Sequence, residues 1–288
     1  MTAMPKLGIS TSNPVDAAIE CLEFGIVSRK PHIHPDGMNG TRSQNAARAI
    51  EGVQEVGGPL RFSPNLTEVA ILWPWAVGAS VNTGVYSLTE AMTGRYLTYD
   101  RELKVDTYDN CYVNSLEITA QRGQAWQWLL DVIGMGETIG NADTFPDLTI
   151  TEDNPLALHH ATMTLFGTAR EFSEVTLRIN NRLDAQAFNT DAVTSIKPGD
   201  TREVTLSCLV PYNSTNLDLR RCAVAGDDGV LAFTYGARSF SLALANTQFP
   251  RGAVETTVKG RKFLRLDGTV RAASDGTKEI IATLDNTP

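Results

Sequence analysis

Residues 202–226, REVTLSCLVPYNSTNLDLRRCAVAG, begin as an alternating pattern and end as a capping pattern. Val204, Leu206 and Cys208 alternate with polar side chains, which predicts a strand with one buried face. The polar run that follows can cap a short helix. The same order occurs in residues 47–78, ARAIEGVQEVGGPLRFSPNLTEVAILWPWAVG, where a helix is predicted between a cap at Ser63 or Asn65 and a stop at Gly78. Pro74 is expected to kink or shorten that helix.

The chain repeats one order of elements around these two stretches. Each half contains a strand, a long polar loop, a second strand, a short helix, a third strand and a closing hairpin. The strand, loop and strand are predicted at 18–30, 31–45 and 46–60 in the first half, and at 172–183, 184–200 and 202–210 in the second. Few residues are identical between the halves, so the similarity lies in the order of elements. That order favours an internal duplication.

The many short alternating strands predict an all-β fold, mainly strand with one short helix per repeat, and a β-sandwich or partly closed barrel in each half. Polar and Gly/Pro-rich stretches indicate where the units meet. We expect an N-terminal arm over 1–16, a first sandwich domain over 17–135, a linker over 136–157 and a second sandwich domain over 158–288.

Composition excludes several classes of protein. The chain has 288 residues, of which 42% are hydrophobic and 20% charged, which is typical of a globular protein. Its net charge of −8 argues against binding nucleic acid through neutralisation of phosphates. It contains neither an apolar run of the ~18–20 residues that a membrane span needs nor the pattern of a signal peptide, so we expect no membrane contact and folding in a cytoplasm. The four scattered cysteines are expected to be buried and reduced.

No catalytic or cofactor motif stands out. His32 and His34, with Asp36 nearby, have a spacing that could bind a metal, but no further ligand cluster completes the shell, and a surface loop is the favoured interpretation. There is no GxSxG motif and no recognisable nucleophile and base, so we expect no enzyme and no cofactor. Trp73 and Trp75 could form a ligand platform or an interface anchor, although core packing is favoured.

Three stretches carry a resemblance to a known family. They are GTRSQNAARAIEGVQEVGGPLRFSPNLTEVAILWPWAVG from Gly40, NCYVNSLEITAQRGQAWQWLLDVIG from Asn110, and FSEVTLRINNRLDAQAFNT from Phe172 with the following IKPGDTREVTLSCLVPY. Together they resemble segments of the major tail tube proteins of long-tailed (siphovirus-type) bacteriophages, over roughly residues 18–245.

The resemblance implies a structural virion protein. In that family, subunits are β-sandwiches with a flanking helix, whose rings close a β-barrel around a channel through which the genome passes into the host. The rings stack into a tube, and long loops and the terminal arm reach the next ring. Two-domain members form trimeric rings with pseudo-sixfold symmetry, which the repeat here favours, while hexameric rings are the alternative. The implied partners are the chain itself, tape-measure and tail-terminal proteins, and passing double-stranded DNA without specific binding. The implied location is the virion tail, after assembly in the host bacterial cytoplasm.

Polar residues on the lining strands would then face the channel, and an acidic lining would repel DNA phosphates. The candidates are Glu23, Glu51, Glu55, Glu174, Thr176, Glu203, Thr205 and Ser207. They could equally be ordinary solvated strand faces. The loops 31–45 and 184–200 and the arm 1–16 are expected to make contacts between rings. The candidates there are His32, His34, Asp36, Arg42, Asp184 and Asp191.

Two other functions stay open at this point. The first is a monomeric β-sandwich that binds carbohydrate or a receptor, with Trp73 and Trp75 as its platform. The second is an enzyme, which the missing nucleophile, base and metal set disfavours.

Overall fold

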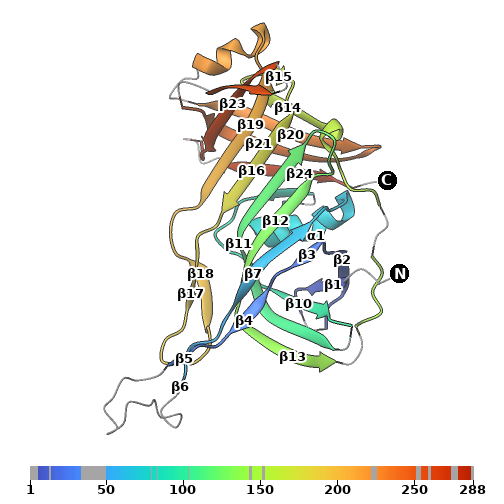
Figure 1. The fold of residues 1–288 in the computed structure, drawn as a ribbon, viewed down its shortest axis with the longest axis vertical. Helices are drawn as coiled ribbons and strands as arrows, with labels where there is room; N and C mark the ends of the chain where they lie inside the picture. The colour runs from blue at the N-terminus through green and yellow to red at the C-terminus, as the bar shows by residue number, and fades with distance from the viewer. Residues whose placement is uncertain are drawn as a thin grey trace.

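The computed structural model of this chain is built mainly from antiparallel strands, which confirms the predicted all-β fold (Figure 1). It describes residues 6–12, 14–33, 50–78, 80–82, 84–102, 104–142, 145–150, 153–221, 226–250, 254–258, 261–273 and 278–286. Within these residues, the only α-helix is α1 (Leu66–Val77). Two 3₁₀ helices accompany it, η2 (Leu158–His160) and η3 (Ser214–Arg221).

The first sheet belongs to the first half of the chain. Its strand order is β2 (Ala17–Glu20), β1 (Lys6–Ser10), β10 (Arg95–Asp100), the start of β11 (Val105–Gln121) and β13 (Gly136–Ala142). Leu7 and Ile9 of β1 are fully buried. Residues 6–10 of the expected arm are therefore part of the core, and residues 136–142 of the expected linker are a paired strand.

A second sheet, which we call the long sheet, runs through both halves. Its order is β3 (Glu23–Phe24) and β4 (Val27–Arg29), β7 (Glu55–Phe62), β12 (Gln127–Gly134), the end of β11, β16 (Glu174–Asn180), β19 (Glu203–Pro211), β23 (Arg261–Val270) and β22 (Val254–Val258). Because β11 pairs with β16, the two halves are hydrogen-bonded into one surface.

A third layer packs behind the second half of the long sheet. Its order is β15 (Thr168–Arg170), β14 (Ala161–Leu165), β20 (Asp227–Tyr235), β21 (Arg238–Gln248), β24 (Ile280–Asp285), β9 (Val85–Ser87) and β8 (Ser80–Asn82). Here β9 of the first half extends a sheet of the second half. Two small hairpins complete the fold, formed by β5 (His32–Ile33) with β6 (Ile50–Glu51) and by β17 (Leu183–Gln186) with β18 (Ser195–Pro198).

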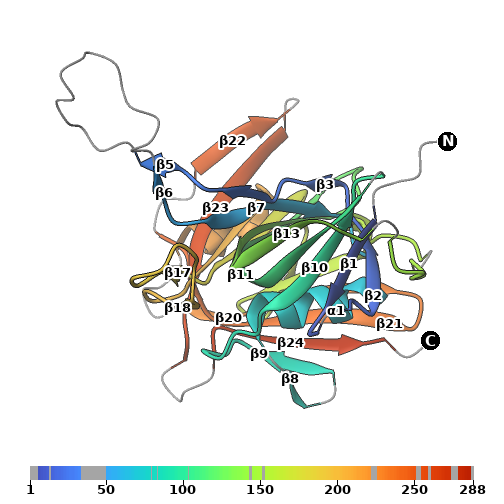
Figure 2. The same ribbon diagram turned by 90° about the horizontal axis from the view of Figure 1, so that it is seen from below.

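Helix α1 begins and ends as the sequence predicts. The Glu68 amide donates to Asn65 Oδ1 (2.9 Å) and the Asn65 amide to Glu68 Oε2 (3.0 Å), which satisfies two of the free donors at the helix start. Gly78, at φ 104°, ends the helix. Pro74 is accommodated in the last turn, so the helix continues to Val77. It packs against β11, β21 and β9, between the layers (Figure 2).

The core around α1 is aromatic and shared by both halves. Trp73 and Trp75 are 1% and 0% exposed, so neither offers a ligand platform, and that alternative is wrong. The indole of Trp75 donates to the Cys111 carbonyl (2.8 Å). Trp126 packs 4.7 Å from the ring of Phe233, which belongs to the second half. The halves therefore bury their largest side chains against each other.

Four local predictions differ from the structure. The strand predicted over 18–30 is divided among β2, β3 and β4, because the chain changes sheets and Gly25 comes close to Pro59. Its Leu22 is 49% exposed rather than buried. The loop predicted over 184–200 is largely the β17–β18 hairpin, and the second predicted helix is the 3₁₀ helix η3. The closing hairpin predicted in the second half does not form, because β23 (Arg261–Val270) pairs with β19, β21 and β22 whereas β24 (Ile280–Asp285) pairs with β21 and β9; the residues of its predicted turn, 274–276, lie outside the described residues.

Candidate assembly surfaces

The long sheet has one buried and one open face, because side chains alternate along each strand. Val204, Leu206 and Cys208 of β19 are buried, as are Val175, Leu177 and Ile179 of β16. Directly opposite residues in neighbouring strands point to the same side of a sheet. The pairing register therefore identifies the residues of the open face.

One row of the register crosses the open face from β3 to β23. Glu23 lies opposite Arg61, which lies opposite Leu129, and the row continues through Glu117, Arg178, Thr205 and Thr269. The next row contains Gln127, Thr119, Thr176, Ser207 and Asp267. Both rows run through strands of both halves.

Seven of the eight predicted channel-facing residues lie on this open face. They are Glu23, Glu55, Glu174, Thr176, Glu203, Thr205 and Ser207. Glu51 is elsewhere, on β6 of a small hairpin. The sequence pattern thus predicts residues of a common surface, although their strands come from opposite halves.

The open face is mixed in charge rather than uniformly acidic. The register adds further acidic residues, Glu117, Asp131 and Asp267, and basic residues, Arg29, Arg61, Arg178 and Arg265. Some opposite charges pair on it or at its margin: Arg61 lies 3.4 Å from Glu23, and Arg182 lies 2.8 Å from Glu203. Among these described residues, acidic groups outnumber basic groups. The sequence-based candidates did not include Glu117 and Asp131. The alternation of buried and partly exposed residues along β11 and β12 could have identified them, but it does not show that these strands lie between β7 and β16.

The long sheet consists of two similar four-strand units. The order β3/β4–β7–β12–β11 in the first half matches β16–β19–β23–β22 in the second. In both units the second strand leads to an asparagine at the start of a helix. Asn65 caps α1, and Asn213 accepts a hydrogen bond from the Asn216 amide (3.0 Å) at the start of η3. The units join at β11 and β16. No other described strand pairs with the outer edges of β3/β4 and β22.

Both small hairpins project from one end of the molecule and are tied together there (Figure 1). The Lys30 ammonium lies 2.6 Å from Glu51 and 2.9 Å from Asp191. The Gln54 amide donates to the Asp191 carbonyl (2.8 Å). The hydrogen bonds and positive charge of Lys30 lower the pKa of the Glu51 and Asp191 carboxyl groups, and these carboxylates in turn raise the pKa of Lys30. Lys30, which directly precedes the predicted loop 31–45, is thus joined to Asp191 of the predicted loop 184–200.

The predicted inter-ring residues divide into two groups. His32 is exposed on β5 opposite Glu51, and Asp184 is exposed on β17 opposite Lys197. Asp191 is in the Lys30 cluster. His34, Asp36 and Arg42 lie outside the described residues.

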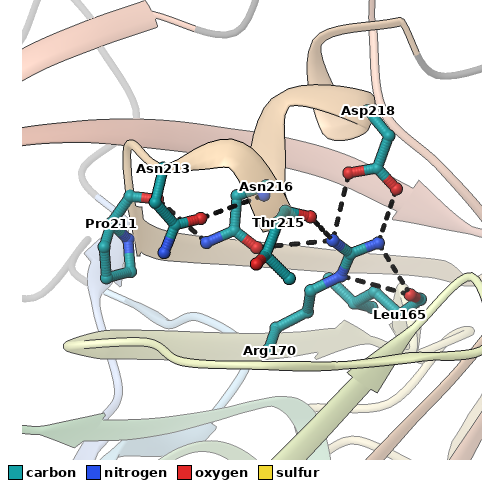
Figure 3. Close-up of polar contacts among 7 residues, drawn as sticks. All are labelled: Leu165, Arg170, Pro211, Asn213, Thr215, Asn216 and Asp218. Atoms are coloured by element: carbon teal, nitrogen blue, oxygen red, sulfur yellow. Dashed lines mark hydrogen bonds and ion pairs between the residues drawn. The ribbon is translucent and has the colours of Figure 1, made fainter.

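A buried arginine organises the opposite end of the molecule (Figure 3). The side chain of Arg170, at the end of β15, is 0% exposed and donates to both carboxylate oxygens of Asp218 in η3 (2.7 and 3.0 Å). It also donates to the carbonyls of Leu165 and Thr215. The hydrogen bond with Arg170 lowers the pKa of Asp218. Because these hydrogen bonds join the end of β15 to η3, Arg170 anchors η3 to the sheet.

The described residues contain no group of three or more His, Cys, Asp and Glu that could hold a metal ion. None of the helices described here is both long and apolar enough to span a bilayer. Cys21, Cys111 and Cys208 are buried, as expected, and burial raises the pKa of Cys21 to about 12, which disfavours a reactive thiolate.

Comparison with known proteins identifies a family for this chain. The family model described as phage tail tube protein matches residues 33–285, which include the whole second four-strand unit and strands β7, β11 and β12 of the first, while β3 and β4 precede the match. A search of curated proteins found no match to the chain.

Proposed function

The chain belongs to the phage tail tube protein family, and from this membership we propose that copies of it assemble edge to edge into rings that stack around a channel. Its role is structural, as a protein of the virion tail. The proposal extends to assembly in the host cytoplasm, to contact with tape-measure and tail-terminal proteins, and to passage of double-stranded DNA through the channel without specific binding.

The observation that carries the proposal is the repeated order of the long sheet. Inside the chain, the last strand of one unit (β11) pairs with the first strand of the next (β16). The same kind of strand stands at each outer edge, β22 at one and β3/β4 at the other. An edge with free backbone groups is a template for another strand. Pairing β22 of one copy with β3/β4 of the next would repeat the internal junction.

The internal junction also predicts the register between copies. Trp128 and Leu264 occupy equivalent positions in the two units. Trp128 lies opposite Phe62, three residues before Asn65, and Leu264 lies opposite Val210, three residues before Asn213. Their partners Ile118 and Glu255 are then equivalent too. At the internal junction, Ile118 lies opposite Leu177. If the outer edges of two copies pair in the same register, Val254 of one copy lies opposite Val27 of the next.

The exposure of Val27 supports this edge as an interface. Its side chain is 44% exposed on the edge strand β4, where a neighbouring strand would cover it. Three chains would supply six four-strand units and close a pseudo-sixfold ring, which is the symmetry we propose over six chains. A division of the chain between the two units belongs to the same proposal, with the boundary after β13 rather than at residue 136.

The open face of the long sheet would then line the channel. Its two rows are polar apart from Leu129, so they offer little apolar surface for bases to stack on, and its excess of carboxylates repels phosphates. The arginines on this face have acidic neighbours, which weakens their attraction for DNA. A conduit requires such weak contact, because each lasting phosphate contact would slow passage.

Cysteines at the two outer edges test the proposal. The variant Val27→Cys/Val254→Cys, treated with a short bismaleimide, should give covalent oligomers that end at three chains on a denaturing gel. The matched control is Val27→Cys/Val230→Cys, because Val230 is exposed on β20, away from both edges. Micrographs of the untreated protein should show rings with a central hole. A purely monomeric protein without crosslinks would refute the assembly, and a ladder ending at six would refute the trimer.

A further inference from the structure

The tip of the β17–β18 hairpin presents an exposed aromatic side chain. Phe188 is 71% exposed, and Asp191 follows it in the same loop with a side chain that is 73% exposed. The tip is held in place, because the Thr194 amide donates to the Gln186 carbonyl (2.9 Å) and Lys30 binds Asp191. An exposed phenylalanine on a fixed tip is an anchor that can bind without a large loss of conformational entropy.

A cleft of about 940 Å³ lies at the other end of the long sheet. It opens between the β11–β12 turn, β14, and the ends of β16, β19 and β23. Its wall includes the apolar side chains of Met163, Phe172 and Phe263. Its exposed charged residues are Arg122, Arg261 and Lys262, which are basic, and Glu171, which is acidic. The cleft is therefore apolar inside and positive at its rim.

The tip and the cleft cannot meet within one molecule. The hairpin connects the end of β16 at Asn180 to the start of β19 at Glu203, whereas the cleft includes Phe172 and Pro211 at the opposite ends of these strands. Seven residues of β16 alone separate them by roughly 20 Å. Figure 1 shows β17 and β18 toward one end of the long axis and β14, β15 and β23 at the other. Such surfaces fit each other only between copies, head to tail.

We propose that the cleft of one copy receives the β17–β18 tip of a second copy in the next ring, with Phe188 against the apolar wall and Asp191 toward the basic rim. This docking rests on the proposed function, since the two copies belong to stacked rings. A head-to-tail contact uses a different surface on each partner and repeats without closing, which produces a filament. A buried aromatic anchor of this kind commonly dominates an interface.

The first test removes the anchor. Phe188→Ala should leave the circular dichroism spectrum and the rings unchanged, while mean tube length in micrographs falls at least about tenfold, as for loss of a dominant interface residue. Ile139→Ala is the matched control, because Ile139 is 75% exposed on β13, away from the tip and the cleft. Lys262→Glu at the rim should shorten tubes as well, whereas Lys104→Glu, an exposed lysine elsewhere, should not.

The second test detects the contact itself. Copies with Phe188→Cys and copies with Arg261→Cys are mixed, assembled and treated with a bismaleimide, and covalent dimers should form only in the mixture. If rings stack normally with Phe188→Ala and the mixture gives no dimers, the docking is refuted while the proposed function stands. If the wild-type chain forms no rings at all, the proposed function fails and the docking with it.

Discussion

Arg170 is the residue whose surroundings most constrain substitution. Its guanidinium is buried, and its hydrogen bonds reach two backbone carbonyls and the Asp218 carboxylate, so β15 and η3 are joined through one side chain. Asp218 itself is 58% exposed, and water can replace its share of the contact. The arginine and its partner should therefore differ strongly in their effect on stability.

We expect Arg170→Met to lower the free energy of unfolding by about 2–4 kcal/mol, because buried carbonyl acceptors lose their donor. Asp218→Asn should cost about 1 kcal/mol or less, since that carboxylate is largely solvated. Denaturant titration of both variants measures the two values. Equal costs would show that the ion pair, rather than the buried hydrogen bonds, holds η3.

At the scale of elements, the Lys30 cluster joins two hairpins that are distant in sequence. Lys30 lowers the pKa of Glu51 and Asp191, so both carboxyl groups favour the ionised form more in the folded state than in the unfolded chain. Their contribution is complete above the ordinary carboxyl pKa and is lost as pH falls through the lowered values. Contact between the hairpins should weaken in acid and be insensitive around neutral pH.

Hydrogen exchange at the Gln54 amide, which donates to Asp191, measures this contact directly. Lys30→Met should reduce its protection by no more than about fivefold near pH 7, as expected for an exposed ion pair. Lys30→Arg is the control that keeps the charge. The difference between wild type and Lys30→Met should vanish at low pH. A difference that persists in acid would contradict the role of the two carboxylates.

At the scale of the whole molecule, the two halves share a sheet and an aromatic core. All four tryptophans belong to the first half, and Phe240 of the second half packs 5.1 Å from Trp73. Tryptophan fluorescence thus reports on the first half and far-ultraviolet circular dichroism on both. Because the core is shared, we expect the two signals to change in one coincident thermal transition.

Phe240→Ala tests the same point from the second half. It should lower stability by about 3–5 kcal/mol and shift the fluorescence transition along with the dichroism transition. Phe188→Ala, an exposed phenylalanine of the same half, should shift neither. A Phe240→Ala protein whose fluorescence midpoint is unchanged would mean that the halves unfold independently.

Properties that depend on neighbouring residues can be predicted from the amino-acid sequence alone. The alternation in 202–210 predicts which side chains of β19 are buried, and a cap at Ser63 or Asn65 with a stop at Gly78 predicts the ends of α1 to within about two residues, because side-chain direction and capping are set within a few residues. The same alternation identified Glu174 and Glu203 as members of an open polar face. The resemblance in these stretches also predicted the family that the comparison found.

Which strands lie next to each other becomes known only from the folded arrangement. It inserts β12 and β11 between β7 and β16, which brings Glu117 and Arg178 into one row and mixes the charge of a face expected to be acidic. It also joins Lys30 to Asp191 across the two halves and closes the aromatic core around Trp73. Strand order follows from packing between residues far apart in the chain, and a local period of two residues contains no information about it.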